Sequence, residues 1–169
     1  MTFWIIQGLG IFALVFYVIS FQMKTKEKLL IIQVISNVFS TIQYILAMAM
    51  TGAIQTALGV LRGIVFCFYK KHNLYPNKIV LLIFELAIIL GTIFTWDGML
   101  CLLPLIAMSA NLYGQWQDDM KWVRILAIFS ATLWLIYAFY TEVYSGMLVE
   151  AFKIISSSVG LWRYRKSDI

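Results

Sequence analysis

Residues 51–71 read TGAIQTALGVLRGIVFCFYKK, and residues 145–166 read SGMLVEAFKIISSSVGLWRYRK. Both segments begin with a hydroxylated residue and a glycine, continue as an apolar run, and end in aromatic and basic residues. The matched positions are Thr51-Gly52 with Ser145-Gly146, and Thr56-Ala57 with Glu150-Ala151. Self-similarity at a fixed spacing is the sequence signature of an internal repeat. The two segments therefore predict a chain built from two related halves.

A second match lies upstream of these segments, where Phe39-Ser40 recurs as Phe129-Ser130. This pair is 90 residues apart, whereas Gly52 and Gly146 are 94 apart. The difference predicts four extra residues in the second half, in the turn before the last apolar segment or in the adjoining helix end. We expect the two turns at residues 50–52 and 141–145.

Composition places the chain in the membrane. Hydrophobic residues make up 62% of the sequence, charged residues make up 12%, and the mean hydropathy is +0.87. These values lie far outside the usual range of soluble domains. A transmembrane helix needs about 20 apolar residues. Seven segments qualify, and together they make residues 1–169 a single all-α membrane domain: 4–22, 29–49, 53–69, 79–95, 98–115, 122–140 and 145–162.

The repeat groups these spans as three, one and three. Residues 4–69 form the first three-helix repeat, residues 98–163 form the second, and residues 79–95 form a linker helix between them. Three spans per half is an odd number, so the linker is needed to restore the orientation of the second half. The two repeats are then parallel and related by an axis along the membrane normal.

The net charge of +5 is distributed unevenly along the chain. Lysine and arginine cluster at alternate span ends, whereas the opposite ends carry Asp97 and Glu142. By the positive-inside rule, the N-terminus is expected outside and the C-terminus in the cytoplasm. The basic residues are interpreted as contacts to anionic lipid headgroups, not to nucleic acid.

Four ionisable residues fall near the middle of spans: Arg62, Glu85, Glu150 and Lys153. Such residues are costly at bilayer depth and often mark functional sites. Glu150 and Lys153 are three residues apart and can pair on one helix, and we expect Arg62 to approach Glu150 across the bundle axis. Arg62, Glu150 and Lys153 form a charged binding site, a proton-coupled gate, or a buried ion-pair network that fixes helix register. Glu85, on the linker, is assigned a structural role.

Amide side chains supply the remaining candidate binding residues. Gln33 and Asn37 lie in the second span, and Asn111 and Gln115 lie in the fifth. Pro104 is the only proline inside a span. Because proline lacks an amide proton and clashes with a carbonyl one turn earlier, here that of Leu100, a kink is expected.

Enzyme chemistry has no candidate residues. His72 is the only histidine, and no set of His, Cys and acidic residues has metal-ligand spacing. No glycine-rich phosphate loop is present. We therefore expect no catalytic activity, no cofactor and no metal.

The opening Trp4-Ile5-Ile6-Gln7-Gly8-Leu9-Gly10, together with Arg62, Glu150 and the ending Trp162-Arg163, resembles the YgjV-type bacterial inner-membrane proteins. The 3+1+3 plan resembles the SWEET and PQ-loop transporter superfamily, although the Pro-Gln dipeptide is absent. The resemblance implies a multi-pass protein of the bacterial inner membrane. Because SWEET-like proteins use prolines in these spans as hinges, it also implies a hinge at Pro104, for which a passive kink is the alternative.

Two functions follow as hypotheses. The first is a small-solute transporter with alternating access between the two repeats, for an unknown and anionic or zwitterionic substrate. The second is a non-transporting membrane protein that binds lipid or a membrane partner. Membrane lipids are the expected partners in both cases, and homo-oligomerisation is left open.

Overall fold

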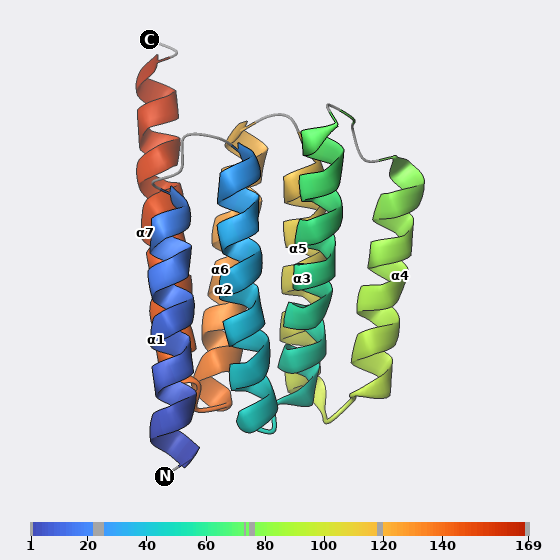
Figure 1. The fold of residues 1–169 in the computed structure, drawn as a ribbon, viewed down its shortest axis with the longest axis vertical. Helices are drawn as coiled ribbons and strands as arrows, with labels where there is room; N and C mark the ends of the chain where they lie inside the picture. Colours follow the sequence, from blue (N-terminus) through green and yellow to red (C-terminus); the bar gives the residue numbers. More distant parts are fainter. Residues whose placement is uncertain (1, 22–25, 73, 75–76, 118–119, 168–169) are drawn as a thin grey trace.

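The structure is a computed structural model that describes residues 2–21, 26–72, 74, 77–117 and 120–167 (Figure 1). Within these residues the chain is helical and has no strand. The elements are α1 (Thr2–Phe21), α2 (Lys26–Leu46), α3 (Met50–Lys71), α4 (Lys78–Phe94), the short 3-10 helix η1 (Met99–Cys101), α5 (Leu102–Trp116), α6 (Met120–Tyr140) and α7 (Tyr144–Ser167). The expected all-α class is confirmed.

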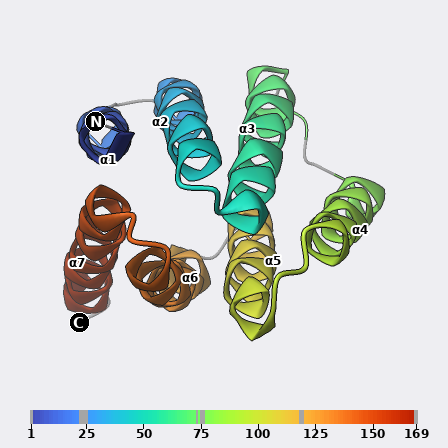
Figure 2. The ribbon, with the colours of Figure 1, turned by 90° about the horizontal axis from the view of Figure 1, so that it is seen from below.

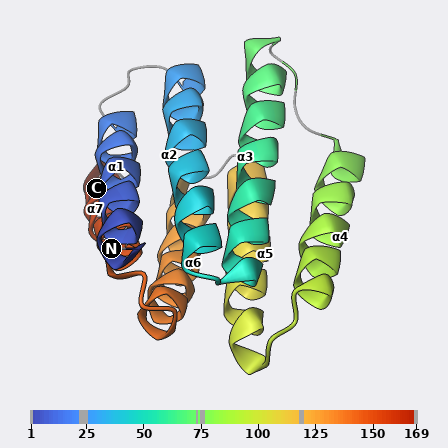
Figure 3. The same cartoon turned by 60° about the horizontal axis from the view of Figure 1, so that its bottom comes forward.

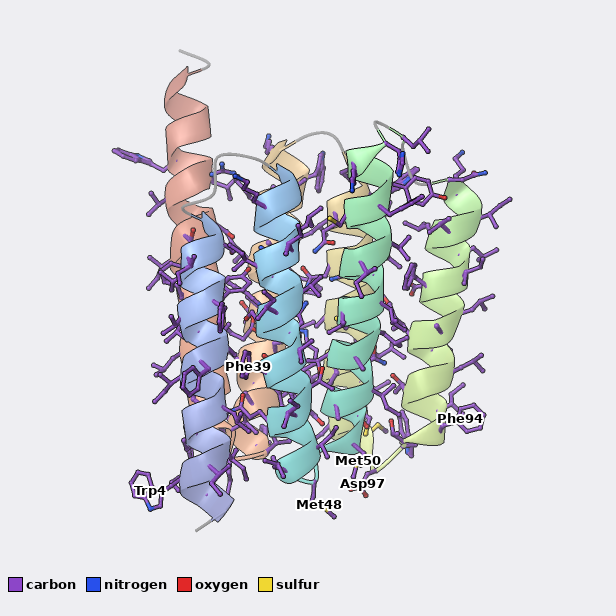
Figure 4. All side chains as sticks on the ribbon, in the orientation of Figure 1. Trp4, Phe39, Met48, Met50, Phe94 and Asp97 are labelled. Atoms are coloured by element: carbon purple, nitrogen blue, oxygen red, sulfur yellow. The ribbon has the colours of Figure 1, made fainter. Side chains whose placement is uncertain are left out.

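Within the described residues, three helices are long and apolar enough to cross a membrane by length and composition. The segments are Phe3–Ser20, Met50–Tyr69 and Lys121–Tyr140, and Leu30–Leu46 is a shorter apolar helix. Large apolar side chains also cover the outside of the bundle. Trp4 and Phe94 are 77% and 83% exposed, and both point away from the bundle at its lower end (Figure 4). An apolar exterior of this extent suits contact with lipid tails.

The helices form two rows with α4 at one edge. Seen along the bundle, α1, α2 and α3 form one row, and α7, α6 and α5 form the other (Figure 2). In the tilted view α7 lies behind α1, and α5 lies behind α3 (Figure 3). The principal neighbours are consecutive helices, together with α1 against α7 and α3 against α5. Helix α4 packs only on α3 and α5 among the principal helix pairs.

The turns that join α2 to α3 and α6 to α7 have the same geometry. Met48 and Glu142 have positive φ angles of 57° and 58°. The Ala49 N–H donates to the Tyr44 carbonyl, and the Val143 N–H donates to the Ala138 carbonyl. Every member of one turn lies 94 residues before its counterpart in the other.

The predicted length difference between the halves is therefore wrong. Helices α2 and α6 have 21 residues each, and residues 47–49 and 141–143 form turns of equal length. The first turn thus lies three residues before the expected position. With a spacing of 94, Ser130 corresponds to Ser36, and both serines are buried. The match of Phe39-Ser40 with Phe129-Ser130 was therefore four residues, or about one helical turn, out of register. Residues one turn apart lie on the same helix face and have similar surroundings, so such a shift is easily mistaken for a true match.

Pro104 occupies the first turn of α5, not the middle of a span. Helix α5 begins at Leu102, directly after η1, and Pro104 is buried. Proline is well tolerated in a first turn because the amide there has no intrahelical acceptor. Leu100, one turn earlier, belongs to η1, so the kink expected from Pro104 stays a prediction that falls at the junction of η1 and α5.

Candidate functional site

Three aromatic side chains fill the interior near the lower end of the bundle. Tyr44 from α2 and Trp134 and Tyr137 from α6 are buried, with ring centroids 5.6 to 5.9 Å apart. The Tyr137 hydroxyl accepts a hydrogen bond from the Gly52 N–H at 3.1 Å. We call these three residues the aromatic layer. They separate the lower turns from the polar residues above them.

A hydrogen-bonded cluster closes the lower end beside this layer. Gln7 Oε1 on α1 accepts hydrogen bonds from the N–H and hydroxyl of Ser145 at 2.8 and 2.9 Å. Gln43 Nε2 on α2 donates to Ser145 Oγ at 2.7 Å. We call Gln7, Gln43 and Ser145 the polar latch. It ties three helices together and satisfies a backbone donor at the start of α7 that has no intrahelical acceptor.

A simpler counterpart of the latch lies where α3 meets η1. Thr51 Oγ1 donates to the Thr95 carbonyl at 2.8 Å and lies 3.1 Å from Cys101 Sγ. The Asp97 N–H donates to the same sulfur at 3.2 Å. Thr51 and Cys101 stand 94 residues from Ser145 and Gln7 respectively. Equivalent pairs of positions therefore join the two halves at two places, α3 to η1 and α7 to α1. Figure 4 places Asp97 with Met48 and Met50 at this lower end.

Glu150 and Lys153 form the predicted pair on α7. Lys153 Nζ donates to Glu150 Oε1 at 2.6 Å. The Lys153 side chain is 20% exposed and the Glu150 side chain is 10% exposed. Lys153 Nζ also lies 4.9 Å from the centre of the Tyr17 ring on α1, a cation–π contact. The second carboxylate oxygen, Glu150 Oε2, is buried and has no hydrogen-bond donor. The pair thus retains a free acceptor inside the bundle.

Arg62 does not join this pair. Its side chain is 5% exposed, and its Nε and Nη1 atoms are buried without an acceptor. The one salt bridge among the described residues joins Glu150 to Lys153. Helices α3 and α7 stand at opposite corners of the two rows, with α2 and α6 between them (Figure 2). The expected approach of Arg62 to Glu150 is therefore wrong.

The predicted amide residues lie on several helices. Asn111 Nδ2 on α5 donates to Ser130 Oγ on α6 at 2.6 Å. Asn37 on α2 faces α3, since its Nδ2 lies 3.5 Å from where a Cβ would sit on Gly59. Gln33 is one turn along α2 from Asn37, and Gln115 is one turn along α5 from Asn111. Both glutamines are half-buried.

Other titratable residues stand apart from these groups. Glu85 on α4 accepts a hydrogen bond from the Ser109 hydroxyl at 2.6 Å. His72 is exposed and lies against the Phe68 ring. Cys67 and Cys101 are free thiols. A search of the described part of the chain finds no group of three His, Cys, Asp or Glu residues that could hold a metal.

A family model described as Bacterial inner membrane protein, Imp-YgjV, matches residues 4–168. The chain belongs to this family. Searches of curated proteins and of solved structures each gave no significant match. Membership confirms the resemblance to YgjV-type proteins and supports a bacterial inner-membrane location.

Sequence reasoning missed three residues that complete the site. Gln7, Gln43 and Tyr17 contact residues of α7 that are more than 100 positions away in the chain. Gln7 and Gln43 carried a usable signal, because a glutamine in an apolar span needs a partner inside the protein. Tyr17 carried no signal, because a tyrosine near a span end is typical of the interfacial belt.

Proposed function

We propose that this inner-membrane protein transports a small zwitterionic solute by alternating access between two parallel three-helix repeats, 4–69 and 98–163. Helix 79–95 serves as the linker, as in SWEET-like transporters. The identical turns 94 residues apart and the matching contacts of α1 with α7 and of α3 with α5 support this arrangement. Two equivalent bundles can rock against each other around a site between them.

The single observation that carries the proposal is the ion pair on α7, in which one of the two Glu150 carboxylate oxygens has no hydrogen-bond donor among the described residues. A buried carboxylate with one oxygen bonded to Lys153 and the other unpartnered can accept a solute ammonium. Lys153 can then pair with the solute carboxylate, and the Tyr17 ring lies beside both. Opposite charges a few ångströms apart match an amino-acid-like molecule better than a simple anion or cation.

The surrounding residues fit a closed outer end. The aromatic layer and the polar latch lie at the end predicted to face outward, and Asn37 and Asn111 lie above them as candidate hydrogen-bonding residues. Pro104, next to the junction of η1 and α5, is the candidate hinge. In this proposal the N-terminus is outside, the C-terminus is cytoplasmic, and all seven helices cross the membrane.

Binding of a panel of amino acids, monocarboxylates and amines to the purified protein, followed by counterflow in proteoliposomes, tests this function. We expect zwitterions to raise the thermal unfolding midpoint and to exchange across the membrane. The double variant Glu150→Gln with Lys153→Met should lose both effects while it stays folded, because replacing both members of a buried pair is often nearly neutral for stability.

The matched control is Glu142→Gln with Lys78→Met, which makes the same changes at exposed positions. It should bind and exchange solute as the wild type does. The transporter proposal fails if the Glu150 and Lys153 double variant exchanges solute at the wild-type rate, or if no zwitterion of the panel is bound.

One observation favours lipid binding as a second candidate function. A groove of about 280 Å³ between α2 and α3 is lined mainly by apolar side chains, including Val34, Ile64 and Phe68, and ends at Lys71. An acyl chain in the groove would place an anionic headgroup beside that lysine. Three results together would favour this function. Phosphatidylglycerol would stay bound to the purified wild type, Lys71→Gln would lose it, and the wild type would exchange no solute.

A further inference from the structure

Arg62 is a buried charged side chain to which the structure gives no partner among the described residues. Its guanidinium makes no ion pair or hydrogen bond with any described residue, and two of its nitrogens are completely buried. Arginine stays protonated in proteins and presents five donors. A buried charge without a counter-charge is costly, and more so at bilayer depth. A bound counter-charge would remove this cost.

The contacts of α3 place Arg62 in the junction of α3, α4 and α5. Gln55 Nε2 donates to the Ile88 carbonyl and to Thr92 Oγ1 on α4 at 2.9 and 2.8 Å. Arg62 is two turns further along the same face of α3. Because α4 runs antiparallel to α3 (Figure 1), this register brings Arg62 level with residues 81–85 of α4.

The register on α5 leads to the same junction. Thr51 contacts Cys101 at the start of α5, and Arg62 lies three turns along α3 from Thr51. Since α3 and α5 run parallel, Arg62 is level with Leu112, which is 1% exposed. Glu85 is the acid that shares this level. Its carboxylate is held by the Ser109 hydroxyl at 2.6 Å and makes no ion pair with Arg62.

We propose that Arg62 forms a site for one small monovalent anion, of the size of chloride or formate, in the junction of α3, α4 and α5. The guanidinium supplies a positive charge and several N–H donors, and a small anion can accept hydrogen bonds from more than one of them. Because Arg62 is only 5% exposed, the proposed ligand is a compact ion and not an organic solute of ordinary size. This site is separate from Glu150 and Lys153 and does not depend on the transport proposal.

Anion-dependent thermal unfolding of the full-length protein in detergent tests the proposal. The midpoint is measured in sodium gluconate while chloride or formate replaces gluconate at constant ionic strength. We expect a saturable rise for the wild type and no rise for Arg62→Gln. Arg62→Lys should keep the dependence with weaker affinity, because lysine keeps the charge and loses the planar fork.

Two further variants make the test specific. Lys78→Gln removes an exposed positive charge at the start of α4 and should leave the anion dependence unchanged. Glu85→Gln removes the negative charge level with Arg62 and should tighten anion binding, because a like charge no longer opposes the ligand. Line broadening of the chloride NMR signal by the wild type, and not by Arg62→Gln, gives a second measurement independent of unfolding.

Three results would overturn the anion site. The first is equal stability of the wild type in gluconate, chloride and formate. The second is an unchanged anion dependence in Arg62→Gln. The third is that, in the absence of small anions, Glu85→Gln and Arg62→Gln lose the same amount of stability. Glu85 would then be the counter-charge of Arg62.

Discussion

The contact between α7 and α1 and the contact between α3 and α5 have related geometry and different chemistry. Ser145 bonds to Gln7 in one, and Thr51 contacts Cys101 in the other, at positions 94 residues apart. Above these, Glu150 and Lys153 correspond to Thr56 and Gly59. One contact therefore contains an ion pair, whereas the other contains a hydroxyl and a glycine.

This difference shows how two turns of the same geometry can precede helices with different chemistry. The turns before α3 and α7 share hydrogen bonds and φ angles, so the backbone of these turns does not distinguish α3 from α7. Thr56 Oγ1 satisfies itself by donating to carbonyls of its own helix and accepting from Thr41. Glu150 is only half satisfied within its own helix, because Lys153 donates to Oε1 and no described residue donates to Oε2. The second half therefore has an unmet requirement that the first half lacks.

The largest effect should come from breaking the ion pair. Lys153→Met leaves the buried Glu150 carboxylate without a counter-charge, which typically costs about 3–5 kcal/mol. The corresponding change in the first half, Gly59→Ala, should alter stability by less than about 1 kcal/mol. The added methyl group would meet Asn37 and Met108 at 3.5 and 3.6 Å, which are ordinary contacts. Unfolding free energies of both variants in mixed micelles check the comparison, and equal values would contradict it.

An intermediate effect is expected at the polar latch. A Cβ added to Gly10 would overlap Ser145 and Gln43, so Gly10→Ala must push α1 away from α7. We expect a loss of about 1–3 kcal/mol, as for other overpacked sites. Gly8→Ala is the control, because no atom lies within 4 Å of its added Cβ, and it should be neutral or slightly stabilising. Thermal unfolding of both variants measures the difference, and a stable Gly10→Ala would rule out the latch as a tight contact.

The smallest effect should come from the two turns. Met48→Gly and Glu142→Gly relieve a positive φ angle, while they increase the entropy of the unfolded chain. The two terms nearly cancel, so each variant should change stability by less than about 1 kcal/mol. We also expect the two variants to change stability by the same amount, because the two turns have the same geometry. A difference well above 1 kcal/mol between the variants would show that the turns are not.

Much of the fold could be predicted from local pattern. Long apolar runs and their basic ends located the helices, and the Thr51-Gly52 and Ser145-Gly146 match gave the spacing of 94 that the structure has. The pair of Glu150 with Lys153 also followed, because residues three apart share a helix face. These inferences depend only on neighbours along the chain.

What could not be predicted depends on which helices face each other. The order of the two rows separates Arg62 from Glu150 and brings Gln7 and Gln43 to Ser145. Helices with apolar residues on all sides give little indication of their neighbours. Pro104 was misplaced for a related reason, because the 3-10 turn before it has no distinct sequence signal.

Cysteine accessibility at Ser40 tests the transport account most directly. Ser40 is four residues before Tyr44 and faces the same interior, whereas Ile42 on the opposite side of α2 is 42% exposed on the outside of the bundle. Ser40→Cys and Ile42→Cys, with Cys67 and Cys101 replaced by serine, are treated with a membrane-impermeant maleimide in right-side-out and inside-out vesicles. Alternating access predicts that Ser40→Cys reacts from both sides and that Ile42→Cys reacts from neither. Reaction of Ser40→Cys from one side only, or from neither side, would contradict the account.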